Sequence, residues 1–123
     1  MKIIVESSEK EFQKLRPSIK KTAAKIGRFL RQKNIYVEIY LVGDRFMEKN
    51  VLAFPAPKNF PRPDLKEKSL GEIYLNPKYI GERGENLTFM LIHGFLHLLG
   101  FDHEKKSDTI IMQKREQELL KQL

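Results

Sequence analysis

The longest apolar run in the chain is FMLIHGFLHLLGF, residues 89–101, and it contains His93, Gly94 and His97. Apolar side chains would lie on nearly every side of a helix built from this run, which predicts a helix surrounded by the rest of the protein. The run is too short to span a bilayer. We therefore expect a buried helix from Gly84 to Gly100 in the middle of the fold.

The segments around this helix predict a mixed α/β fold. Residues 2–5 (KIIV) and 35–42 (IYVEIYLV) are rich in β-branched and aromatic side chains, which are typical of strands. Residues 51–55 (VLAFP) and 71–75 (GEIYL) predict two further short strands. The expected fold class is α/β, with a small mixed four-stranded β-sheet packed with helices.

Two more helices are expected besides the central one. Between residues 12 and 30 apolar side chains recur every three or four positions, and Pro17 is expected to break this helix into a short and a longer piece. A closing helix is expected from Ser107 to Leu123. Because the sequence has no internal repeat and no Gly/Ser linker, residues 1–123 are expected to form a single domain.

The amino-acid composition limits the classes of protein to which this chain can belong. The chain contains no cysteine, which excludes disulfides and thiolate metal ligands. Its 23 Lys and Arg against 16 Asp and Glu give a net charge of +7, which suits a nucleic-acid partner as well as an ordinary solvated surface. The N-terminal MKIIVESSEK has too short an apolar stretch for a signal peptide, so we expect a soluble, cytoplasmic protein with no membrane association.

All three histidines of the chain lie within HGFLHLLGFDH, residues 93–103. His93 and His97 are four residues apart, which places their imidazoles on one face of a helix. Gly100 is positioned to end that helix with a left-handed residue, after which His103 can turn back as a third ligand. Three nitrogen ligands and one open position are typical of a catalytic zinc site, so the spacing predicts one Zn²⁺ per chain.

Other interpretations of these residues exist. A histidine on an apolar helix face is often an ordinary hydrogen-bonded core residue, and many pairs four residues apart bind no metal. The spacing coincides with the metzincin signature H-E-x-x-H-x-x-G-x-x-H, but Gly94 replaces the glutamate that acts as general base. Gly94 is explained either by close packing against a neighbouring element or by room for a bulky substrate. Either way, peptide hydrolysis by the metzincin route is disfavoured.

The same residues fit the pattern H-G-x-L-H-L-x-G-x-D-H and closely resemble the YbeY family of bacterial ribosomal-RNA maturation factors. NVLAFP (50–55) is similar to the V-L-S-F-P strand of that family, with Lys49, Asn50 and Ala53 in place of threonine, aspartate and serine. LGEIYLNP (70–77) is similar to its L-G-D-I strand. Met112 and Glu116 also fit the ending of the family.

This resemblance implies a zinc-dependent, single-strand-specific endoribonuclease that acts in 16S ribosomal-RNA 3′-end maturation and ribosome quality control. It implies ribosomal RNA and the ribosome or ribosome-associated proteins as partners, and His93, His97 and His103 as the metal ligands. Two alternatives remain. One is a metal-stabilised, noncatalytic factor that binds the ribosome or its RNA, and the other is a metal-dependent hydrolase of peptides or small molecules.

The chain departs from the family between its second and third strands. Relatives usually carry a longer segment there with a tyrosine-arginine pair, whereas this chain has only GDRFMEK. Arg45 and Arg62 are candidates for the missing arginine by charge alone, the spacing of Arg45 to Val51 does not match the family, and both are better explained as solvated surface residues.

Further candidates for function lie outside the histidines. Asp102 is expected either to orient a ligand imidazole through a hydrogen bond or to serve as a turn residue. A basic helix face is expected either to contact RNA phosphates or to be merely solvated, and its members are Lys14, Lys21, Lys25 and Arg28.

Overall fold

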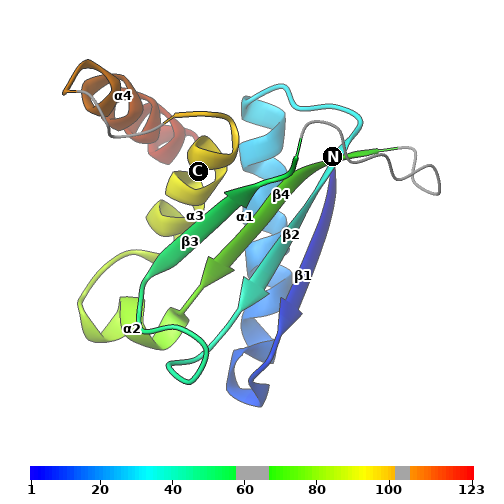
Figure 1. Cartoon of the computed structure of the whole chain (residues 1–123), viewed down its shortest axis with the longest axis vertical. Coiled ribbons are helices and arrows are strands. Elements are labelled where there is room, and N and C mark those ends of the chain that lie inside the picture. Colours follow the sequence, from blue (N-terminus) through cyan, green and yellow to red (C-terminus); the bar gives the residue numbers. More distant parts are fainter. Residues whose placement is uncertain (58–66, 102–105) are drawn as a thin grey trace.

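The computed structural model of the protein describes residues 1–57, 67–101 and 106–123, the side chains of 106–108 excepted. Its centre is a mixed sheet in the order β1-β2-β4-β3 (Figure 1). β1 and β2 are parallel, as are β2 and β4, whereas β3 is antiparallel to β4. The predicted mixed four-stranded sheet is confirmed, and its strands are β1 (Lys2–Ser7), β2 (Ile35–Leu41), β3 (Val51–Pro55) and β4 (Lys68–Leu75).

One face of the sheet carries the core. Alternate residues of β2 and β4 are fully buried because successive side chains of a strand point to opposite faces, and they are Val37, Ile39, Leu41, Ile73 and Leu75. The three longer helices contribute to the same core: α1 (Arg16–Phe29), α3 (Leu87–Leu98) and α4 (Lys106–Gln122). Figure 1 shows α1 behind the sheet and α4 at the upper left, next to α3. The predicted burial of the central helix is confirmed, since most of the α3 side chains are buried.

The proline in the first helical segment acts as the sequence predicts. A 3₁₀ helix, η1 (Lys10–Leu15), precedes α1, and α1 begins at Arg16 with Pro17 in its first turn. A proline is tolerated there because the first amides of a helix have no intrahelical partner.

The helix predicted from Gly84 begins later, at Leu87. Gly84 has φ of +66°, which a right-handed helix does not allow. Asn86 instead starts α3, because its side-chain oxygen accepts a hydrogen bond of 2.9 Å from the amide of Phe89. The sequence analysis did not predict α2 (Pro77–Glu82), although Asn76 caps it in the same way and Pro77 lies in its first turn. No described helix is long and apolar enough to cross a bilayer.

The opposite face of the sheet presents aromatic side chains and carboxylates. The Tyr40 and Tyr74 rings stack at 5.0 Å between centroids. Phe46, 62% exposed, also stacks on Tyr74, and Phe54, 52% exposed, meets Tyr74 edge-on. Tyr74 donates a hydrogen bond of 2.8 Å to Glu72, and burial together with that bond raises the pKa of Tyr74 to about 12. Tyr40 donates to Glu38, and this bond raises the pKa of Tyr40 above its usual range.

Candidate metal site

The imidazoles of His93 and His97 converge on one point beside α3. Their Nε2 atoms lie 3.1 Å apart, and the rings are inclined at 70°. Two nitrogens bound to one tetrahedral zinc at about 2.0–2.1 Å would lie roughly 3.3 Å apart. The observed separation therefore fits two ligands of a single ion, and it equally fits an N–H···N hydrogen bond between the rings without metal.

A buried carboxylate lies behind His93. Glu116 of α4 is 2% exposed, and its Oε2 is 3.2 Å from Nδ1 of His93. A carboxylate in this position accepts a hydrogen bond from Nδ1–H, and in that tautomer the lone pair of Nε2 is directed towards His97. Sequence reasoning matched Glu116 to a family position and missed this contact. A signal was available in the sequence. Glu116 lies four residues after Met112 and three before Leu119, so all three share one helix face, and two of them are apolar.

The convergence point of the imidazoles opens into a cleft of about 410 Å³ between α3 and β3. One wall consists of Lys49, Asn50, Val51, Leu52 and Ala53, and the other of Phe89, Met90, His93 and His97. The cleft therefore combines imidazoles, an apolar surface and one permanently charged side chain, Lys49. No carboxylate is among its described lining residues.

Gly94 faces the sheet and is not among the residues that line the cleft. A Cβ atom at this position would lie 2.9 Å from Cγ2 of Ile73, closer than carbon atoms normally approach. The glycine thus allows α3 to pack directly on β4. Of the two interpretations of Gly94, the structure supports close packing, and a glutamate here would meet Ile73.

Gly100 ends α3 as its sequence position predicts. Its φ is +96°, its amide donates to the carbonyl of His97 at 3.0 Å, and the Phe101 amide donates to that of Leu96 at 3.0 Å. This pair of bonds is the Schellman arrangement, which reverses the chain after a helix. Asp102 and His103 lie outside the described residues, and within the described ranges no three potential metal ligands come together. The third ligand stays a prediction.

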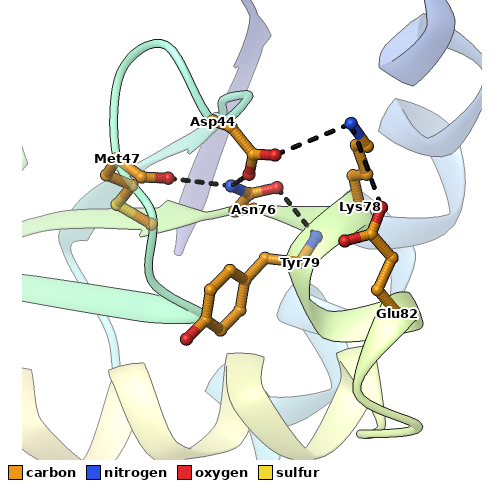
Figure 2. Close-up of polar contacts among 6 residues, drawn as sticks. All are labelled: Asp44, Met47, Asn76, Lys78, Tyr79 and Glu82. Atoms are coloured by element: carbon orange, nitrogen blue, oxygen red, sulfur yellow. Dashed lines mark hydrogen bonds and ion pairs between the residues drawn. The ribbon is translucent and has the colours of Figure 1, made fainter.

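The segment between β2 and β3 is held by Asn76, as Figure 2 shows. The buried amide of Asn76 donates to Oδ1 of Asp44 and to the carbonyl of Met47, both at 2.8 Å. Lys78 adds an ion pair to Asp44 at 3.6 Å. Arg45 is exposed within this anchored turn and does not line the cleft. Arg62 lies outside the described residues.

The basic residues expected on the first helix are exposed but do not reach the cleft. Lys14 lies on η1, and Lys21, Lys25 and Arg28 lie on α1. Lys25 borders a separate hollow of about 250 Å³ together with Asn86 and residues of the α4 end. These four side chains form a basic surface apart from the histidines.

Comparison with known proteins decides the family. A family model described as "Endoribonuclease YbeY" matches residues 3–123, nearly the whole chain. The chain belongs to the YbeY family. The matched range contains all three histidines.

Individual YbeY relatives agree with this assignment. Endoribonuclease YbeY of Thermodesulfovibrio yellowstonii is 34% identical over 110 residues, covering 72% of this chain and 67% of the relative. Endoribonuclease YbeY of Rhodopseudomonas palustris strain BisB18 is 38% identical over 84 residues, covering 60% of this chain and 49% of the relative. The matched regions thus span from about half to two thirds of the length of these relatives.

A solved structure shares the fold. The solution structure of TM1509 from Thermotoga maritima has a TM-score of 0.59 and 23% sequence identity. The similarity covers 98% of this chain and 87% of that one. The four-stranded sheet with its helices therefore follows an arrangement already known among solved proteins.

Proposed function

We propose that this YbeY-family chain is a zinc-dependent endoribonuclease that cuts single-stranded regions of ribosomal RNA. The observation that carries the proposal is the convergence of the His93 and His97 Nε2 atoms, 3.1 Å apart, at a cleft. Membership of a family described as an endoribonuclease supports RNA as the substrate. Its place of action is then the cytoplasm, in 16S 3′-end maturation and ribosome quality control, with the ribosome or ribosome-associated proteins as partners.

His93, His97 and His103 are the proposed ligands of one zinc ion per chain. The donor set fits zinc because neutral imidazole nitrogens are preferred zinc ligands and three of them leave one position open. Bound there, zinc would lower the pKa of a water molecule towards neutrality and stabilise negative charge on a phosphate oxygen. Glu116 keeps Nε2 of His93 directed at the site, through its 3.2 Å contact with Nδ1.

The shape of the cleft supports a single strand as substrate. Its walls bring the apolar side chains of Leu52, Phe89 and Met90 close to the imidazoles. An unpaired nucleotide can place its base against such apolar and aromatic surface while its phosphate approaches the histidines, whereas a base held in a duplex cannot.

The test combines metal analysis with cleavage assays. Purified protein is expected to hold about one zinc per chain and to cut a single-stranded RNA while leaving the matched duplex intact. His93→Ala is the matched control, because it should remove cleavage and leave most RNA binding. Cleavage that persists undiminished in the His93 variant would reveal a contaminating nuclease.

A noncatalytic RNA-binding factor is the second candidate, and one observation favours it. No aspartate or glutamate lines the described part of the cleft, so no carboxylate there can act as general base. Zinc-loaded protein that binds ribosomal RNA yet leaves single-stranded regions uncut would establish this alternative. Hydrolysis of peptides or small molecules is less well supported, since the position of the metzincin glutamate packs against Ile73.

A further inference from the structure

Lys49 is the one permanently charged side chain among the described residues that line the cleft with His93 and His97. It is exposed, and it forms no ion pair in the described part of the chain. A lysine that lines a cleft with no carboxylate among its described lining residues creates a positive potential that attracts anions. This potential would add to that of a cation held by the histidines.

Hydrogen bonds hold the backbone on both sides of Lys49, so the position of its Cα atom is well defined. The Asn50 carbonyl accepts a hydrogen bond of 3.1 Å from the amide of Asn76, and the Asn50 side chain donates to Glu85 at 3.3 Å. The Asn50 Oδ1 accepts a bond of 2.7 Å from Val51 at the start of β3. On the other side, the carbonyl of Met47 is held by Asn76 (Figure 2).

These anchors also separate Lys49 from the other cations near it in sequence. Arg45 belongs to the turn closed by hydrogen bonds from the amides of Phe46 and Met47 to the carbonyl of Gly43, at 3.0 and 3.2 Å. Arg45 does not line the cleft, and Lys49 does. The basic residues of α1 lie on another surface.

We propose that Lys49 binds a phosphate of the RNA strand that occupies the cleft and so positions this strand against the histidines. The proposal rests on the proposed function for the identity of the ligand. A lysine ammonium acts as a point charge with three donors, and it therefore contacts one phosphate oxygen or two without reading the base. Lys49 is in this view a substrate-binding residue that contributes affinity and position and no sequence preference.

The experiment measures binding of a fluorescently labelled single-stranded RNA to zinc-loaded protein over a range of salt concentrations. Lys49→Ala should weaken binding roughly three- to tenfold at low salt and lower the slope of log K against log salt by about 0.7, as expected for one lost phosphate contact on a single strand. Lys49→Arg should restore most of the lost RNA affinity and most of the lost salt slope. Zinc content should stay at the wild-type value in both variants.

The matched control is Lys33→Ala, since Lys33 is exposed and precedes β2, at the opposite end of the sheet from the β3 start. Its affinity and salt slope should equal the wild type. A series of RNAs with single neutral methylphosphonate linkages adds a positional test. At one position in the RNA, the neutral linkage should weaken binding to the wild-type protein and should leave binding to the Lys49→Ala variant unchanged. Arg62→Ala, tested in parallel, should leave that linkage effect intact.

The outcomes separate this proposal from the proposed function. Wild-type cleavage with equal RNA affinity in Lys49→Ala and Lys33→Ala would overturn the role of Lys49 and leave the nuclease standing. A Lys49-dependent salt slope in a protein that cuts no RNA would support the role of Lys49 and overturn the nuclease. Absence of RNA binding by the wild type would overturn both.

Discussion

His93 and Glu116, which are 23 residues apart, join α3 to α4 through a contact of 3.2 Å between Nδ1 and Oε2. The carboxylate is buried, and the imidazole is 23% exposed towards the cleft. One side of the ring is therefore held by the core, while Nε2 on the other side faces His97 at 3.1 Å beside the cleft. This division is typical of a histidine that a protein orients for metal binding.

Replacing Glu116 should weaken zinc binding. Glu116→Ala removes the acceptor for Nδ1–H, and we expect a loss of about 10- to 100-fold in zinc affinity, measured by competition with a chromophoric chelator. Glu116→Gln keeps an oxygen acceptor and should lose less. Glu118→Gln is the control, because Glu118 pairs with Arg115 at 2.9 Å on the surface. Equal affinities in all three variants would show that the contact plays no part in metal binding.

Removing one imidazole should abolish stoichiometric zinc. His97→Ala leaves at most two of the three proposed ligands, which is fewer than a catalytic zinc site normally provides. Elemental analysis after dialysis should then find much less than one zinc per chain. Full zinc content in a variant with His93, His97 and His103 all replaced by alanine would contradict the central metal assignment.

Gly94→Ala should destabilise the protein in spite of the better helix propensity of alanine. The new methyl would lie 2.9 Å from Cγ2 of Ile73, which has little freedom to move because χ1 of a β-branched residue is restricted. Overpacking costs typically about 1–3 kcal/mol and helix propensity returns about 1 kcal/mol, so we expect a net loss of up to about 2 kcal/mol in the free energy of unfolding.

Urea denaturation measures this effect, and a second substitution tests its cause. Ile73→Ala removes the clashing group, so the Gly94→Ala substitution should cost less in that background than in the wild type. Purely additive effects would exclude the contact as the cause. For the same reason, Gly94→Glu should create no peptidase activity, since its side chain would start towards the sheet and not towards the cleft.

Tyr40 and Tyr74 should titrate above the ordinary range of phenols. Folding raises the pKa of Tyr74 to about 12, so the stability that this neutral phenol contributes is complete below pH of about 10 and is lost as pH rises towards 12. Phenolate absorbance followed against pH should show the raised titration. Glu72→Gln should shift part of it back to lower pH, and an unchanged curve would contradict the assignment to the Tyr74–Glu72 pair.

The basic surface of α1 should contribute to RNA binding and not to chemistry. Changing Lys21, Lys25 and Arg28 together to glutamate should weaken RNA binding at low salt, with the difference shrinking as salt rises, because phosphate contacts act through counterion release. Zinc content should be unaffected. Equal RNA affinity at low salt in the triple variant and the wild type would identify this surface as merely solvated.

Much of this protein could be predicted from short-range pattern alone. β-branched runs, a 3.6-residue apolar period and the position of Pro17 predicted the strands, the three longer helices and the break before α1, but not α2. The spacing of His93 and His97 placed both imidazoles on one helix face, and Gly100 predicted the reversal after it. These features depend on residues within a few positions of one another, where backbone geometry is set by local sterics and hydrogen bonds.

The remaining features required the packing of distant segments. The pairing of Glu116 with His93, the contact of Ile73 with Gly94 and the approach of Lys49 to the histidines each join residues from different elements. The periodicity of a sequence does not predict which side chains will meet across a core. Those contacts depend on how the side chains of neighbouring helices and strands fill the space between the elements. The sequence therefore located His93 and His97 on one helix face, and tertiary packing decided which carboxylate contacts His93 and which cation lines the same cleft.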